Sequence, residues 1–109
     1  MSVSDIRKID MIGTSQESQR VVLTISDHLE WENDINTHLF ILQEKINTYL
    51  GFIESNEIYK TFPDSINRDI EIRIYFKCAP PPSTSNFFRK IEEILSIKKI
   101  FLQIIDAKI

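Results

Sequence analysis

Hydrophobic and polar residues alternate along Asp69–Cys78, which is the pattern of a β-strand with one face on the core and one in water. The apolar side carries Ile70, Ile72, Ile74, Phe76 and Cys78, and the other side carries Glu71, Arg73, Tyr75 and Lys77. Residues 20–25 repeat the pattern, with Val21, Leu23 and Ile25 on one side and Val22 and Thr24 on the other. Both segments are therefore predicted to be strands with one buried face.

Two further strands are predicted from short apolar segments, Arg7–Ile12 and Lys99–Asp106. The polar segment 13–19 separates the first of these from the strand at residues 20–25, and it begins with Gly13. A polar connection of this length favours a hairpin between the first two strands.

A helix is predicted from about Asp34 to Ser55, because apolar residues recur there at spacings of three and four. The stripe consists of Ile35, Leu39, Leu42, Ile46, Tyr49 and Ile53. Asn33 or Asp34 can cap the first turn by accepting hydrogen bonds from free backbone N–H groups. Phe40, Ile41 and Phe52 lie off the stripe, so a second side of this helix is expected to be buried or to meet a partner.

A second helix is predicted from Ser83–Ser85 to about Ser96, after the Pro80–Pro82 run that ends the preceding strand. The order of elements is then ββαβαβ, which places the chain in the α+β class. We expect a single domain, residues 1–109, in which one four-stranded mixed sheet carries both helices on one face. The last two strands are joined through a helix and are expected to run parallel.

Charge is distributed unevenly along the chain, although the net charge is only −3. Residues 1–57 hold ten acidic and four basic side chains, whereas residues 58–109 hold six acidic and nine basic ones. An acidic first half argues against nucleic acid as a partner, because phosphate binding needs clustered Lys and Arg. The basic pairs Arg89-Lys90 and Lys98-Lys99 are expected to be solvated.

The single cysteine, Cys78, argues against a disulfide framework and against a cysteine-based zinc site. The start of the sequence lacks the pattern of a secretory signal, and no apolar stretch approaches the roughly 20 residues needed to span a bilayer. We therefore expect a cytoplasmic protein that does not associate with membranes.

The most distinctive segment, Asp27–Asp34, follows the second strand and contains the only tryptophan, one of two histidines and no lysine or arginine. Acidic residues around an aromatic anchor favour an interface with a basic protein, since the charges speed association and the tryptophan anchors it. The predicted partner-binding residues are Asp27, His28, Glu30, Trp31, Glu32 and Asp34. Alternatively, Asp27 caps a turn, the acids complement the helix dipole and Trp31 fills the core.

Metal- or small-ligand-dependent activity at Asp27, His28 and His38 is a second alternative, since these residue types are common metal ligands. No H-E-x-x-H motif or cysteine pair accompanies them. Ser26 beside Asp27 and His28 does not make a triad, because neighbours on an extended chain point in different directions. We therefore expect no enzyme activity, no cofactor and no bound metal.

Three motifs are distinctive along this chain: V-x-L-T-I-S-D-H-L-x-W at Val21–Trp31, L-Q-E-K-I-N-x-Y-L-x-F-I-E-S at Leu42–Ser55, and the proline stop at Pro80–Pro82. With them the chain resembles, over nearly its full length, a family of small bacterial proteins classed as a domain of unknown function. The resemblance implies a lone cytoplasmic domain and carries no established activity.

We predict a non-catalytic protein-binding module, of the type of an immunity protein that neutralises a basic toxin domain through an acidic surface. Some small acidic bacterial α+β proteins of this size act in that way, so the argument is an analogy of size and charge. A third alternative is a structural domain that self-associates, as a homodimer, through an open sheet edge or through Phe40 and Phe52.

Overall fold

The computed structural model describes residues 8–32 and 34–106 of the chain. The strands are β1 (Met11–Thr14), β2 (Val21–Asp27), β3 (Ile70–Phe76) and β4 (Ile100–Asp106). The α-helices are α1 (Ile35–Glu54), α2 (Glu57–Thr61) and α3 (Ser85–Ile97), and 3-10 turns at Pro63–Ser65 and Pro82–Thr84 precede β3 and α3. Within these residues, no helix combines the length and the apolar character needed to cross a lipid bilayer.

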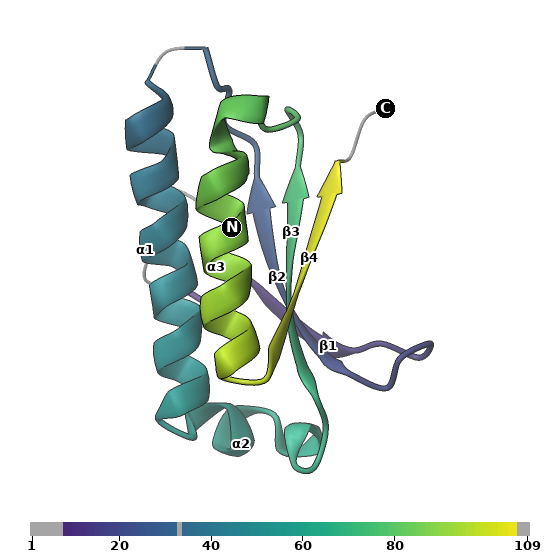
Figure 1. The fold of residues 1–109 in the computed structure, drawn as a ribbon. Helices are drawn as coiled ribbons and strands as arrows, with labels where there is room; N and C mark the ends of the chain where they lie inside the picture. Colours follow the sequence, from purple (N-terminus) through teal and green to yellow (C-terminus); the bar gives the residue numbers. More distant parts are fainter. Residues whose placement is uncertain (1–7, 33, 107–109) are drawn as a thin grey trace.

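One mixed sheet contains the four strands in the order β1-β2-β3-β4. β1 and β2 pair antiparallel as a hairpin, whereas β2 with β3 and β3 with β4 pair parallel. Parallel neighbours need crossover connections, which α1 and α3 provide. These two helices lie side by side on the same face of the sheet (Figure 1). The predicted α+β class, the mixed sheet and the parallel pairing of the last two strands are therefore confirmed.

The hydrophobic core lies between the sheet and the two long helices. On the sheet it contains Val21, Leu23 and Ile25 of β2 and Ile72, Ile74 and Phe76 of β3, all with no exposed surface. The helices add Leu42, Ile46 and Tyr49 from α1 and Phe88 and Leu95 from α3. The alternation in the sequence predicted this face correctly, because every second side chain of a strand points the same way.

The buried side of α1 contains two polar residues that the predicted apolar stripe did not include. His38 and Lys45 are 3% and 0% exposed, whereas Ile53 at the end of the predicted stripe is only half-buried. Lys45 Nζ donates to the carbonyl oxygen of Lys8 at 2.7 Å and to Asp10 Oδ1 at 3.0 Å. Polar side chains enter a core when they find such partners, and hydrophobic periodicity does not detect them.

The first strand lies later in the chain than predicted, since β1 covers Met11–Thr14 and the prediction was Arg7–Ile12, whose first residue is outside the described part. Gly13, predicted to begin the connection, is therefore within the strand. Pairing with β2 sets this boundary, because the hairpin loop closes through a hydrogen bond from Ser15 N to Arg20 O at 2.8 Å.

The other long elements lie close to their predicted limits. α1 begins directly after Asp34 and ends directly before Ser55, and β4 begins one residue after the predicted Lys99. The short helix α2 was not predicted, because five residues are too few to show a helical period. Cys78 lies beyond the end of β3 and is half-buried, so it does not continue the buried face of that strand.

Candidate functional site

The segment Asp27–Asp34, in which residue 33 is not described, connects β2 to α1 and is called the acidic elbow here. Asp27 is the last residue of β2 and lies opposite Phe76 in the parallel ladder with β3. The backbone N–H of Lys77 donates to the carbonyl oxygen of Asp27 at 3.0 Å. The acidic elbow is therefore tied to the segment that follows β3, at the carboxyl ends of the parallel strands.

A buried acid–base pair lies under the acidic elbow. Asp27 and His38 are 2% and 3% exposed, and Asp27 Oδ2 lies 2.5 Å from His38 Nε2. Asp27 Oδ1 accepts a hydrogen bond from the backbone of Leu29 at 3.0 Å, while His38 Nδ1 lies 3.2 Å from the carbonyl oxygen of Glu30. A carbonyl oxygen can only accept, so Nδ1 must carry a proton, and one further proton lies between Nε2 and the carboxylate.

Trp31 covers this pair and closes the core beside it. Its ring stacks on His38 with centroids 3.6 Å apart and an angle of 14° between the planes. Its Nε1 donates to the carbonyl oxygen of Cys78 at 2.9 Å, and its ring contacts Phe76 at a centroid distance of 6.0 Å. With 7% of its surface exposed, Trp31 is a core residue that joins the acidic elbow, α1 and the end of β3.

The outer side of the acidic elbow carries the exposed side chains of His28, Glu30, Glu32 and Asp34. Asp34 is the N-cap of α1, since its Oδ1 accepts from the backbone of Thr37 at 3.2 Å and its Oδ2 from the hydroxyl of Thr37 at 2.6 Å. These hydrogen bonds, the hydroxyl first, hold the pKa of Asp34 below its ordinary value. Glu30 and Glu32 are thus the exposed acids of the acidic elbow without a capping role.

The six predicted partner-binding residues therefore divide into an inner and an outer group. Asp27 and Trp31 are buried, so they offer little surface to a partner and instead support the segment from below. Sequence reasoning included them because it could not distinguish the inward from the outward positions of an irregular segment. The four exposed residues stay predicted contact residues.

Chemistry at Asp27, His28 and His38 finds little support in this geometry. His28 is exposed, whereas both ring nitrogens of His38 already have partners and leave no lone pair for a metal. Among residues 8–32 and 34–106, no group of three His, Cys, Asp or Glu side chains could hold a metal ion. Ser26 is exposed on the sheet face opposite to that of Asp27, so the two side chains diverge as expected for a strand.

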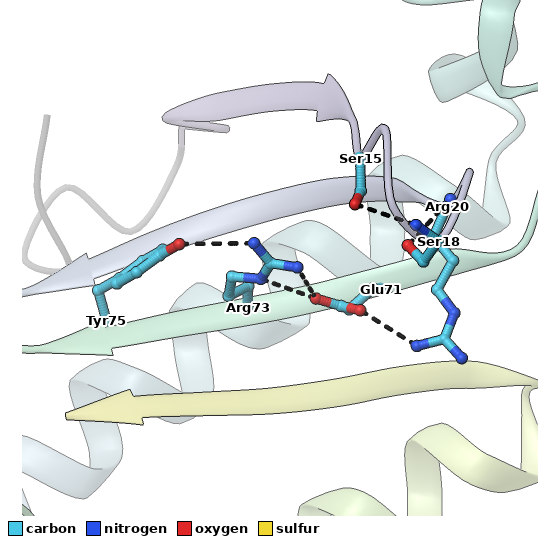
Figure 2. A network of polar contacts seen from close by, with 6 residues as sticks. All are labelled: Ser15, Ser18, Arg20, Glu71, Arg73 and Tyr75. Carbon is cyan, nitrogen blue, oxygen red and sulfur yellow. Dashed lines mark hydrogen bonds and ion pairs between the residues drawn. The ribbon is translucent and has the colours of Figure 1, made fainter. Parts of the chain in front are cut away.

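A second polar cluster lies on the sheet face that the two long helices leave uncovered (Figure 2). The side chain of Glu71 is only 3% exposed and accepts from two arginines. Arg20 Nη1 donates to Oε1 at 3.2 Å, and Arg73 donates to Oε2 from Nε at 2.8 Å and from Nη2 at 2.7 Å. The hydrogen bond of Arg73 to the hydroxyl of Tyr75, followed by that to Glu71, raises the pKa of Arg73 above its ordinary value.

This cluster links neighbouring strands on the uncovered face of the sheet. The guanidinium of Arg20 also lies 3.6 Å from the ring centroid of Phe101, so it bridges β3 and β4. Because the arginines satisfy a buried carboxylate, their charges are already engaged and do not form an open anion site. The alternation in β3 predicted Glu71 to be in water, and the signal of its burial was the arginine two positions later on the same side.

The fold and the acidic elbow define a small α+β protein with one mixed sheet and an acidic loop built over a buried Asp27–His38 pair. The chain belongs to DUF6572, a family of unknown function whose sequence profile matches residues 1–107. The resemblance to a family of unknown function over nearly the full chain is thereby confirmed. Comparisons with curated proteins and with solved structures found no match.

Proposed function

We propose that this protein is a non-catalytic protein-binding module that binds a basic protein through the acidic elbow. Within that class, we propose an immunity-type role, in which the module occludes a basic toxin domain. The observation that carries the proposal is that Glu30 and Glu32 are exposed on a loop whose underside is fixed by the buried Asp27–His38 pair.

The fixed underside supports binding because a partner does not have to order the loop. The backbone N–H of Leu29 donates to Asp27, and the ring of His38 donates to the carbonyl oxygen of Glu30. The indole N–H of Trp31 donates to the carbonyl oxygen of Cys78. Ordering of loops and side chains is a main cost of association. Because these hydrogen bonds already order the loop, less of the free energy of its contacts with a partner is lost to ordering, and more of it contributes to affinity.

The charges of Glu30 and Glu32 are available to a partner. No ion pair of the described residues involves Glu30 or Glu32. They belong to the half of the chain, residues 1–57, that carries ten acidic and four basic side chains. A concentrated negative surface accelerates the approach of a basic protein and disfavours acidic ones.

The test is a capture experiment with the tagged full chain in lysate of the source organism at low and moderate salt, read by mass spectrometry. The variant E30Q/E32Q removes two charges from the acidic elbow, while the control E17Q/E57Q removes two charges from exposed sites elsewhere in the acidic half. We expect one basic protein to be captured stoichiometrically by the wild type and the control and to be lost with E30Q/E32Q.

Two results would contradict the proposal. If no stoichiometric partner is captured at low salt, the protein is not a binding module of this kind. If both double variants lose the partner equally, net charge alone holds it and the acidic elbow is not the interface.

A further inference from the structure

β4 forms one rim of the sheet, and no described strand pairs with its outer edge (Figure 1). Two of its large apolar side chains, Phe101 and Ile104, are 43% and 39% exposed. Proteins usually protect such an edge with lysine, proline or a bulge, and the β4 sequence I-F-L-Q-I-I-D contains neither lysine nor proline. An edge with this composition is a template for pairing with another strand.

We propose that the partner strand is β4 of a second copy of this chain. The two strands pair antiparallel about a two-fold axis that passes through Gln103, so that the sheets of the two copies become one continuous sheet. Such a closed two-fold contact uses the same surface twice and leaves no unpaired edge at the contact. The surface contains no residue of the acidic elbow, so this proposal and the proposed function can fail independently.

The pattern of side chains along β4 selects the position of the axis. Residues that lie opposite each other in a sheet share a face, and a two-fold axis at Gln103 pairs apolar with apolar at the two positions on either side of the axis. Ile100 and Asp106 lie opposite each other only at the two ends of the paired strands. Phe101 then lies opposite Ile105 on the uncovered face, and Leu102 opposite Ile104 on the helix face. The two Gln103 amides face each other and can exchange hydrogen bonds.

Neighbouring positions of the axis give poorer pairs. An axis at Leu102 places Phe101 opposite Gln103 directly beside the axis. An axis at Ile104 places Gln103 opposite Ile105 there and moves the exposed Asp106 inward to lie opposite Leu102. Of the three positions, only the axis at Gln103 keeps the pairs nearest to it apolar on both faces, which favours this register for pairing with a second copy.

The charged residues of α3 also favour a two-fold axis at Gln103. Residues of α3 that line a hollow with α1 include Phe87, Ile91 and Ile94, so Arg89 and Glu92 lie on the opposite flank of the helix. Arg89 and Glu92 line a hollow with Leu102 and Ile104 of β4. A two-fold axis at Gln103 runs two copies of α3 antiparallel, so Arg89 of each copy lies opposite Glu92 of the other. This complementarity favours a second copy over an unrelated strand.

Sedimentation equilibrium of the full chain over a range of concentrations tests the proposal. We expect a reversible monomer–dimer equilibrium, and we expect Q103K to raise its dissociation constant at least about tenfold because it opposes two like charges at the axis. F40K is the matched control, since Phe40 is 60% exposed on α1 and would lie outside this interface. Circular dichroism and thermal unfolding establish that each variant is folded.

A charge exchange tests the position of the axis. R89E and E92R each oppose like charges across the proposed contact and should weaken the dimer, whereas the double variant R89E/E92R should restore it. A monomer at every concentration overturns the proposal, whatever else binds the β4 edge. The proposal is also overturned if F40K abolishes the dimer while Q103K leaves it intact. It is overturned as well if R89E/E92R dimerises more weakly than either single variant.

Discussion

Asp27 and His38 lie eleven positions apart in the sequence and form the buried pair on which the acidic elbow rests. The sequence predicted the place of each residue, one at the end of a strand and the other in the first turns of a helix. It could not predict their contact, because that depends on the angle at which α1 leaves the elbow. Packing of Trp31 on His38 helps to set that angle, and nothing in the local pattern specifies it.

At this residue, D27A should lower the free energy of unfolding by about 3–5 kcal/mol, because it leaves a buried histidine without its partner. D27N should cost less, since its amide can still donate to His38 Nε2. Urea unfolding followed by the fluorescence of Trp31, the only tryptophan, measures both values. E32A on the same elbow is the control and should change stability by less than about 0.5 kcal/mol. A D27A variant as stable as E32A would show that the pair contributes nothing.

Asp34 gives a prediction about pH. Its pKa lies below the ordinary value of 3.8, so its ionised form stabilises the fold above that value, and the stabilisation is lost as pH falls through the lower pKa of the folded state. Wild type should therefore be more stable than D34N at neutral pH, and the difference should shrink to zero in strong acid. Thermal unfolding of both proteins across this pH range provides the comparison. A difference that does not depend on pH would contradict the charged-cap account.

Helices and strands with clear end signals were predicted well from the sequence. α1 has a capping aspartate before its first residue and a long apolar stripe, and its observed limits match the prediction. β1 was misplaced because its position depends on pairing with β2, a non-local contact that its own residues do not encode. α2 is a single short turn with no period of its own, so local pattern could not identify it.

Gly51 offers a test of how α1 is stabilised. It lies exposed in the helix, and a Cβ added there would meet nothing within 4 Å. G51A should therefore raise the free energy of unfolding by about 0.5–1 kcal/mol, because alanine loses less backbone freedom on entering a helix. G13A in β1 also has open space but should lack this gain, since alanine is not favoured in strands. A destabilised G51A would indicate a close contact at this position that the structure does not contain.

At the scale of the whole molecule, both long helices cover one face of the sheet and leave the other face to side-chain networks. The element order and the alternation in β2 and β3 predicted the covered face. The exposure of the uncovered face was predicted only in part. Glu71 is buried there by Arg73 of the same strand and by Arg20, which directly precedes β2 and is distant in sequence. Contacts between segments distant in sequence thus account for what the sequence did not predict, in this cluster as in the acidic elbow.

The most direct test of the central claim is the association rate between this protein and its captured partner, measured at several salt concentrations. We expect E30Q/E32Q to slow association and to flatten its dependence on salt, with E17Q/E57Q close to wild type, because attraction between opposite charges is screened by ions. Equal rates and equal salt dependence for wild type and E30Q/E32Q would contradict the claim that the acidic elbow is the binding surface.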